Sequence, residues 1–220
     1  MASSPAAPAA PDATPPDRQD RRSRRRQETI EEILDLAVEV MTEAGVNGLS
    51  LSEVARRLGV QPPSLYKYFP SLMAVYDAIF ERGMAEMLAV MHEAMDAQPP
   101  GLRSLVAGLD ANGRWCLEHP VVAQLLFWRP VPSFEPSPQA FAFSGEMVDV
   151  QRAALADAVA AGELGPGAAT EEGVCLVSIM IAGSLSQAMA NEPGSIWGTG
   201  RFSPLFPKLV ALLPAAYPPD

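Results

Sequence analysis

Apolar residues recur every three or four positions along most of this 220-residue chain. This spacing places side chains on one face of an α-helix. It predicts a first helix of about 18 residues, with the apolar positions from Ile30 to Ala44 facing inward and Gly45 ending it. No stretch alternates with the two-residue period of a β-strand over a useful length. The pattern therefore predicts an all-α protein of about nine helices.

The segment from Leu49 to Pro70 predicts two short helices joined by a tight turn. Ser50 and Glu53 have the spacing of a capping box, in which the hydroxyl and the carboxylate bond backbone N–H groups at a helix start. Gly59 ends that helix because a residue without a Cβ adopts the left-handed conformation easily, and Pro63 suits the first turn of the next helix. Two such crossing helices form a helix-turn-helix, whose second helix enters the major groove of DNA.

The rest of the chain predicts a larger helical bundle. A helix from 71 to 96 would span roughly 38 Å, which is enough to connect two domains. Breaks rich in proline and glycine separate further helices at 102–117, 121–127, 138–162, 170–191 and 204–213. The predicted organisation is a disordered tail with a basic arm at 1–25, a helix-turn-helix domain at 26–72 and a helical-bundle domain at 73–220.

The net charge of −10 argues against a general polyanion-binding protein, but the charge is unevenly distributed. From Arg18 to Pro70 there are nine basic and eight acidic residues, whereas from Asp96 to Asp220 there are six and twelve. The segment Met1–Asp17 is rich in Ala, Pro and Ser. It lacks the basic region followed by an apolar region that a signal peptide has, so we expect a disordered tail. The basic residues concentrate in an arm formed by Arg18, Arg21, Arg22, Arg24, Arg25 and Arg26.

Few residues suggest catalysis or metal binding. Cys116 and Cys175 lie in separate apolar helical patterns, which favours two buried thiols in a reducing cytoplasm. His119 precedes a proline at an expected helix end, where a cation suits the dipole, so we interpret it as a cap. No nucleophile elbow, phosphate loop or metal-ligand cluster is present. We expect no enzyme activity, no cofactor and no metal. We also expect no transmembrane helix, because no apolar run is long enough to form one.

A set of residues in the helix-turn-helix has a specific spacing: Ser50, Val54, Ala55, Leu58, Gly59, Val60, Leu65, Tyr66 and Phe69. From Arg26 to about Asp77 the chain thereby resembles the TetR-type bacterial transcriptional regulators, whereas the remainder matches them only in helical layout and length. The resemblance implies two kinds of DNA contact. Base edges would be contacted by Gln61, Pro62, Pro63 and Lys67, and phosphates by Ser50, Ser64, Tyr66 and Tyr68.

The chain departs from the family pattern at two positions. Leu72 stands where the family usually has a lysine, which removes one expected phosphate contact, and Tyr68 replaces a more usual histidine. We expect Lys67 and the arginines Arg24, Arg25 and Arg26 to compensate by contacting phosphates or an adjacent groove. The alternative is that the arginine segment is only a solvated, flexible tail.

Aromatic and methionine side chains are frequent in the C-terminal half. Most of them are expected in the core, but cavities between bundle helices have similar linings. The family layout implies that an apolar small molecule binds there. The acidic composition favours a neutral or cationic one, although surface solubility explains that composition equally well. The candidate ligand-binding residues are Trp115, Phe127, Trp128, Phe141, Met147 and Met180.

The last two predicted helices carry a candidate dimer interface. Two recognition helices must lie roughly 34 Å apart to read successive half-sites, which requires a dimer. The apolar positions could pack against a second copy as a four-helix interface, or they could form intramolecular core. They are Val174, Val177, Ile181, Leu185 and Ala188, followed by Phe206, Leu209, Val210 and Leu213.

The sequence thus predicts a homodimeric, cytoplasmic DNA-binding transcriptional regulator without membrane association. We expect a repressor that an unidentified apolar small molecule releases from a palindromic operator in double-stranded DNA, with residues 73–220 providing ligand binding and dimerisation. Two alternatives stay open. One is a helical-bundle small-molecule carrier or enzyme without specific DNA binding, and the other is a constitutive DNA-binding protein without an effector.

Overall fold

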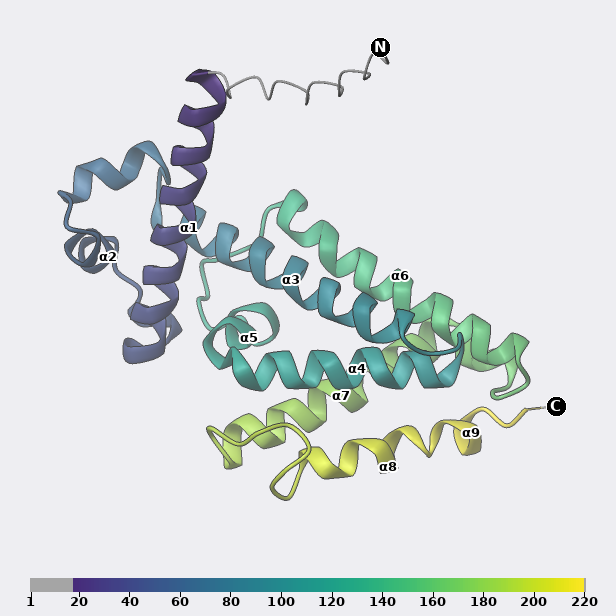
Figure 1. Cartoon of the computed structure of the whole chain (residues 1–220). Helices are drawn as coiled ribbons and strands as arrows, with labels where there is room; N and C mark the ends of the chain where they lie inside the picture. Colours follow the sequence, from purple (N-terminus) through teal and green to yellow (C-terminus); the bar gives the residue numbers. More distant parts are fainter. Residues whose placement is uncertain (1–17, 220) are drawn as a thin grey trace, which may run out of the picture.

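The computed structural model describes residues 18–219, and all regular elements within this range are helices. Nine α-helices and four short 3-10 helices follow one another in the described chain, which confirms the all-α prediction (Figure 1). The predicted disordered tail, Met1–Asp17, lies outside the described residues.

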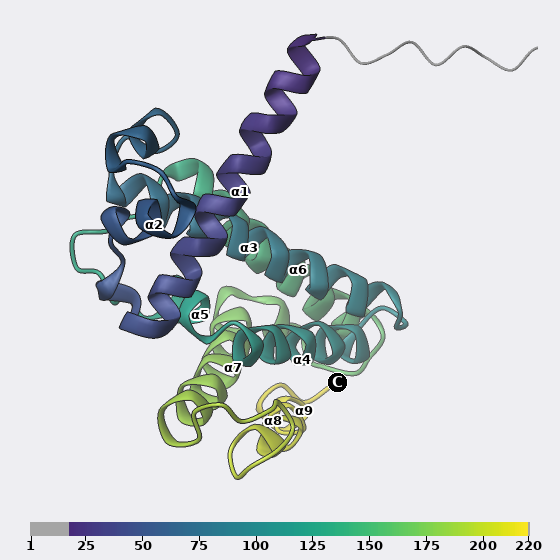
Figure 2. The same ribbon diagram turned by 60° about the vertical axis from the view of Figure 1, so that its left-hand side comes forward.

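Helix α1 (Arg18–Ala44) has 27 residues and is longer than predicted. It includes the arginine segment, because arginine, glutamine and glutamate are favourable helix formers. Its N-terminal turns project beyond the rest of the protein (Figure 2). The inner side of its C-terminal half carries Ile33, Ala37 and Met41, which are fully buried. The basic arm is therefore a continuation of a packed helix.

The helix-turn-helix domain contains the 3-10 helix η1 (Val46–Gly48), followed by the two crossing helices α2 (Leu51–Leu58) and η2 (Pro62–Lys67). The sequence predicted a short second helix here, and the structure forms it as a six-residue 3-10 helix. Pro62 and Pro63 lack backbone N–H groups, so the first internal bond in η2 is from Ser64 N to Gln61 O, at 2.8 Å. That bond spans three residues, as a 3-10 helix requires.

The capping box predicted at the start of α2 is absent. Ser50 is the N-cap residue of α2, but its side chain makes no capping hydrogen bond. The carboxylate of Glu53 instead accepts two hydrogen bonds from Arg56, at 2.7 and 2.8 Å, and one from Arg57, at 2.8 Å. The predicted end of the helix is confirmed, since Gly59 has a left-handed backbone with φ of 74°.

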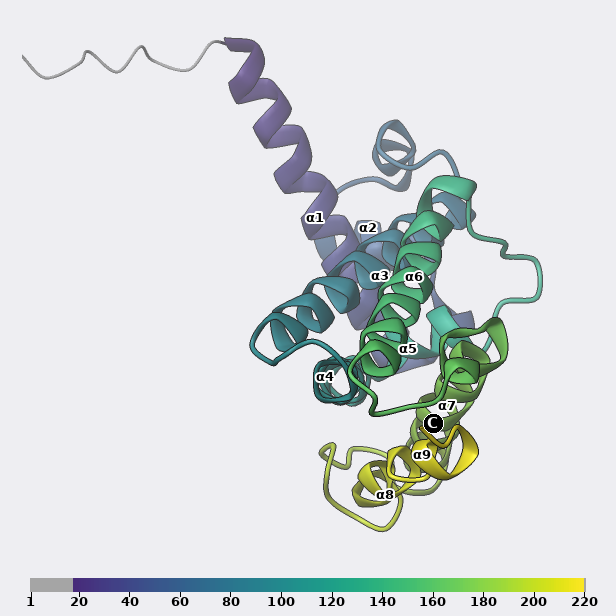
Figure 3. The same cartoon turned by 90° about the vertical axis from the view of Figure 1, so that its right-hand side faces the viewer.

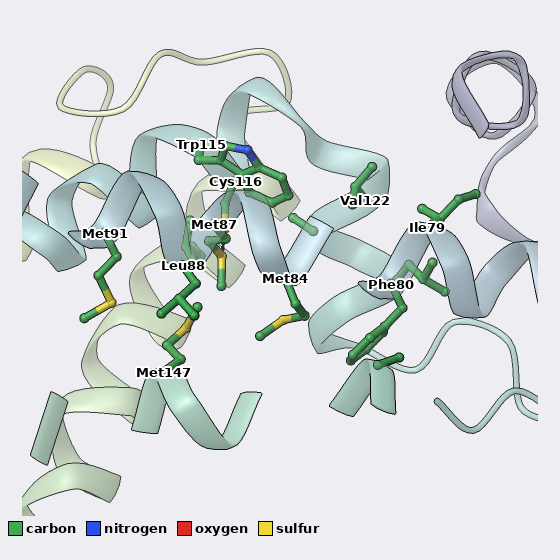
Figure 4. Packing of buried hydrophobic residues seen from close by; sticks show 14 of the residues in the cluster. Ile79, Phe80, Met84, Met87, Leu88, Met91, Trp115, Cys116, Val122 and Met147 are labelled. Carbon is green, nitrogen blue, oxygen red and sulfur yellow. Dashed lines mark hydrogen bonds between the residues drawn. The ribbon is translucent and has the colours of Figure 1, made fainter. Parts of the chain in front are cut away.

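Helix α3 (Leu72–Asp96) is the central element, and it belongs to both halves of the protein. Ser71 caps it by accepting from Ala74 N at 3.2 Å. Near its start, the Tyr76 hydroxyl donates to Val46 O at 2.6 Å and ties α3 to the helix-turn-helix. Further along, Met84, Met87 and other apolar residues of α3 face the C-terminal bundle, as Figure 4 shows.

The C-terminal bundle is built on α4 (Leu102–Glu118), α5 (Pro120–Phe127), α6 (Pro138–Ala160), the 3-10 helix η3 (Pro166–Ala169) and α7 (Glu171–Asn191). These α-helices begin and end within a few residues of the predicted bounds. Helices α4, α5 and α6 pack on α3, and α7 packs on α4 and α6, away from α1 (Figure 3).

The C-terminal segment is less regular than predicted. In place of one helix at 204–213 it contains η4 (Ser203–Leu205), α8 (Phe206–Val210) and α9 (Leu213–Ala216). The physical reason is the prolines within this short segment, among them Pro207 and Pro214, which cannot donate a backbone hydrogen bond.

Helix α7 corrects three expectations. Cys175 is exposed, whereas Cys116 is buried as predicted. The predicted dimer stripe from Val174 to Ala188 is largely intramolecular core, with Val177 and Leu185 almost fully buried. By length and composition α7 also passes as a possible membrane span, although a third of that window is buried within the chain. One such helix is weak evidence for a membrane, because helices of a protein core have the same composition.

Candidate functional site

The exposed surface of the helix-turn-helix is set by the three-residue period of η2. Leu65 is completely buried and holds η2 against the core, whereas Pro62 and Tyr68, three residues before and after it, are half-buried. This geometry exposes some of the predicted base-contacting and phosphate-contacting residues and partly buries the others. The exposed ones are Gln61, Pro63, Tyr66 and Lys67, with Ser64 half-buried between them.

A basic groove lies between α1 and η2. Its lining residues are Arg22, Arg25, Arg26 and Thr29 from α1, with Lys67 from η2 and Tyr68 directly after it. The Arg26 guanidinium donates to Lys67 O at 3.4 Å and lies 5.1 Å from the centre of the Tyr68 ring. The Lys67 ammonium is 4.9 Å from the centre of the same ring. The structure therefore places part of the arginine arm beside η2.

The cations of the basic groove carry unneutralised charge. Among the ion pairs of the described chain, none involves Arg25, Arg26 or Lys67. In contrast, Arg57 pairs with Glu43 at 2.6 Å and Glu53 at 2.8 Å. Positive charge is thus available in the groove, whereas the basic residues of α2 are locally neutralised.

The acidic partners in this cluster are strongly ionised. Hydrogen bonds from Arg56 and Arg57 lower the pKa of Glu53 to about 2. The hydrogen bond from Arg57 also lowers the pKa of Glu43. The network joins α1 to α2 through the pair of Arg57 with Glu43 and Glu53.

Three remaining positions can be placed on this surface. Arg24 is exposed on α1 but does not line the basic groove. Ser50 is half-buried at the start of α2. Leu72, where the family resemblance implies a lysine, is half-buried and packs against the core, so it serves the fold at that position.

A cavity of about 350 Å³ lies in the C-terminal bundle between α3, α4, α5, α6 and α7. Four of the six predicted ligand-binding residues line it: Phe127, Trp128, Phe141 and Met147. Trp115 and Met180 are not among its lining residues. Trp115 is buried and its ring stacks on that of His119 with centroids 4.6 Å apart, so it is a core residue.

The cavity also contains polar groups that were not predicted from the sequence. Asn112 and Gln151 line it and are each 5% exposed, and Ser144 and Ser178 add hydroxyl groups. The signal was present in the sequence, because Asn112 and Gln151 occupy positions of the apolar helical period where a hydrophobic residue is expected. The other lining residues are Phe80, Met84, Met87, Leu109, Leu126, Val148, Ile181, Ala182 and Leu185.

His119 acts as the predicted helix cap, with Nδ1 2.9 Å from Trp115 O at the end of α4. Within residues 18–219, no three or more His, Cys, Asp or Glu residues come together in a group that could hold a metal ion.

Comparison with known proteins finds a family match in the N-terminal part of the chain. Residues 33–79 match the family model described as bacterial regulatory proteins, tetR family. Over 54 residues the chain is 41% identical to the tetracycline repressor protein class A from transposon 1721 of Escherichia coli. The matched segment covers 24% of this chain and 25% of the repressor. The chain spans only about a quarter to a third of the curated relatives it matches.

Several solved structures have a fold similar to that of this chain over most of its length. A protein of unknown function from Rhodococcus sp. RHA1 has a TM-score of 0.72 at 20% identity, covering 86% of this chain and 94% of that one. The transcriptional regulator FadR from Bacillus subtilis, in complex with stearoyl-CoA, has a TM-score of 0.64 at 18% identity and covers 83% and 96%. At such identities the likeness concerns the fold.

Proposed function

This chain belongs to the TetR family of bacterial regulatory proteins, and from that premise we propose that it is a dimeric repressor released from its operator by a small molecule. The observation that carries the proposal is the basic groove beside the exposed face of η2. Residues 26–72 would form the DNA-binding domain and residues 73–220 the ligand-binding and dimerisation domain. Such a regulator works in the cytoplasm on the nucleoid.

The proposed DNA contacts follow from exposure and chemistry. Gln61, Pro63 and Lys67 are exposed and suit base edges, since an amide pairs with adenine and a ring carbon contacts the thymine methyl group. Tyr66, which is 54% exposed, suits a phosphate. The half-buried residues would lie at the margins of this contact. Hydroxyl groups would come from Ser50, Ser64 and Tyr68, whereas Pro62 would act through the position of its main chain.

The arginine arm is proposed to contact the phosphates next to the recognition element. Arg25 and Arg26 line the basic groove together with Lys67, and Arg24 is exposed on the same helix. A helix that presents several cations without acidic partners binds the DNA backbone independently of sequence. The arm would thus replace the phosphate contact that Leu72 does not provide.

The proposed release mechanism uses α3 as the connection between the two halves. Phe80, Met84 and Met87 of α3 line the cavity, whereas Tyr76 on the same helix is bonded to Val46 of the helix-turn-helix. A ligand that binds better when α3 is displaced would favour a dimer in which the recognition elements have the wrong separation. The shift cannot exceed the difference in ligand affinity between the two states.

The dimer interface is proposed on the outer face of α7. Ile179 is 67% exposed, and Cys175, Ala182 and Gly183 are also exposed on this face. These apolar or small side chains, unlike the buried stripe predicted from the sequence, are available to a second copy. Leu212 beyond α8 is 60% exposed and would extend the same interface.

Binding to the intergenic DNA beside the gene tests the proposal. We expect the full-length protein to bind one such fragment in a gel-shift assay more tightly than a duplex of equal length with scrambled sequence. Equal affinity for the two duplexes at moderate salt would contradict sequence-specific regulation. The same result would favour a carrier or enzyme built on this fold.

A further inference from the structure

We propose that the cavity binds an uncharged, elongated amphiphile, and that Asn112 and Gln151 recognise a hydroxyl or other neutral hydrogen-bonding group at its inner end. This inference rests on the proposed function, because it names the ligand class for the same cavity.

The polar end of the cavity is defined by two buried amides from different helices. Asn112 comes from α4 and Gln151 from α6. Among the described residues, neither Asn112 Oδ1 nor Gln151 Oε1 has a hydrogen-bond partner. A buried carbonyl oxygen without a partner is unfavourable, and a ligand group that donates a hydrogen bond would remove that cost.

The amide nitrogen of Asn112 has only weak partners. It lies 3.4 Å from the sulfur of Met91 and 3.8 Å from that of Met147. A thioether is a poor acceptor, so turning the amide over would still leave one strong hydrogen-bonding group unsatisfied. A hydroxyl group both donates and accepts, and it can therefore pair with the two amides in either orientation.

The lining of the cavity disfavours a charged ligand. No ionisable side chain is found among its lining residues in the described chain. A carboxylate, phosphate or ammonium group placed at the amides would lose its hydration without gaining a counter-charge, which is strongly unfavourable. A neutral polar group incurs a far smaller loss.

The shape of the cavity favours an elongated molecule. On α6, Phe141 and Gln151 both line the cavity and lie ten residues apart, which is about 15 Å along the helix. Phe141 is 57% exposed and Phe127 42% exposed, so they mark the open end, whereas Gln151 is buried. Met147 lies between these ends on α6 and provides apolar surface for an alkyl or fused-ring body.

Three probes with the same alkyl chain test the charge preference in the full-length protein. They are decan-1-ol, used below its solubility limit, and decanoate and decyltrimethylammonium, each used below its micelle concentration. We expect decan-1-ol to raise the melting temperature and to bind at least tenfold more tightly than either ion in titration calorimetry. Equal or tighter binding of an ion, or no binding of decan-1-ol, would overturn the inference.

Substitution of the two amides tests their role. In Asn112→Leu and Gln151→Leu we expect decan-1-ol to bind at least fivefold more weakly, without a lower melting temperature of the free protein, because each change removes an unpaired buried oxygen. Gln139→Leu makes the same change at an exposed position of α6 outside the cavity and should leave binding unaltered. Unchanged decan-1-ol affinity in both cavity variants would contradict the assignment.

Operator binding by the same preparations separates the two proposals. If the protein binds its intergenic DNA specifically but shows no preference for decan-1-ol, only the ligand class is wrong. If specific DNA binding is absent, the proposed regulatory function fails whatever the probes show.

Discussion

Single side chains determine both the shape and the charge of the proposed DNA-contacting surface. Tyr68 has the cations of Arg26 and Lys67 within about 5 Å of its ring. An exposed cation–π contact contributes about 0.5–1 kcal/mol, so the ring can hold both side chains near the groove. Tyr68 would therefore act on DNA binding through its ring as well as through its hydroxyl group.

Two substitutions separate these roles of Tyr68. We expect Tyr68→Leu to weaken operator binding by about 1.5–3.5 kcal/mol, since leucine has neither the ring that holds the two cations nor the hydroxyl group. Tyr68→Phe keeps the ring and removes only the hydroxyl group, which should weaken binding by about 0.5–1.5 kcal/mol. Fluorescence anisotropy with labelled operator measures both, and an affinity of Tyr68→Leu as high as that of Tyr68→Phe would exclude a role for the ring.

The Glu53 cluster predicts a pH dependence of stability. Because the pKa of Glu53 is lowered to about 2 in the folded protein, its contribution is present above the unfolded value near 4.5 and is lost as the pH falls toward 2. We expect Glu53→Gln to be less stable than wild type in urea at pH 6, with a smaller difference at pH 3. A difference that stays constant would contradict this assignment.

Exposed positions were easier to predict at this scale than hydrogen-bond partners. The sequence correctly suggested that Gln61, Tyr66 and Lys67 would be accessible. It could not predict that Arg56 and Arg57 would outcompete the backbone for Glu53, because one carboxylate has several partners within reach. Asn112 was overlooked because one polar residue in an apolar period carries little information about a cavity.

At the scale of the elements, the arm and η2 line one groove because α1 continues through the arginine segment. The periodic apolar pattern predicted the long helices well, because the spacing of apolar residues along a long helix is visible in the local sequence. The short elements were predicted poorly. In η2 and the C-terminal segment, the number and position of prolines decide between α-helix, 3-10 helix and a break.

Neutralising the arm tests its part in DNA binding. We expect Arg24→Gln, Arg25→Gln and Arg26→Gln together to lower the slope of log affinity against log salt by about 0.9 for each phosphate that the arm no longer neutralises. Glutamine preserves helix propensity, so circular dichroism should be unchanged. The control carries the same charge change on α4 and α6, at Arg103, Arg114 and Arg152. An unchanged slope in the arm variant would exclude phosphate contacts by the arm.

At the scale of the whole molecule, the cavity and the proposed dimer face meet on α7. Ala182 lines the cavity and is also exposed on the outer face of that helix. A bound ligand could therefore act on the dimer through α7 as well as on the helix-turn-helix through α3. The sequence could not separate the two sides of α7, because intramolecular core and a dimer interface both require apolar residues.

A charge on the outer face of α7 tests the dimer. We expect Ile179→Glu to convert the protein to monomers in light scattering, since burying an unpaired carboxylate at the interface is unfavourable. Operator affinity should fall at least tenfold because a monomer reads only one half-site. Ile196→Glu makes the same change at a position that is 71% exposed in the loop after α7, and it should remain dimeric. A dimeric Ile179→Glu protein would place the interface elsewhere.

The central claim is that the surface around η2 reads DNA. The most direct measurement is the affinity of the Tyr66→Ala, Lys67→Ala double variant for the intergenic fragment, beside wild type and with circular dichroism as a check of the fold. We predict a loss of about 2–4 kcal/mol, with the preference over scrambled DNA abolished and helicity unchanged. Wild-type affinity and preference in this variant would contradict the account.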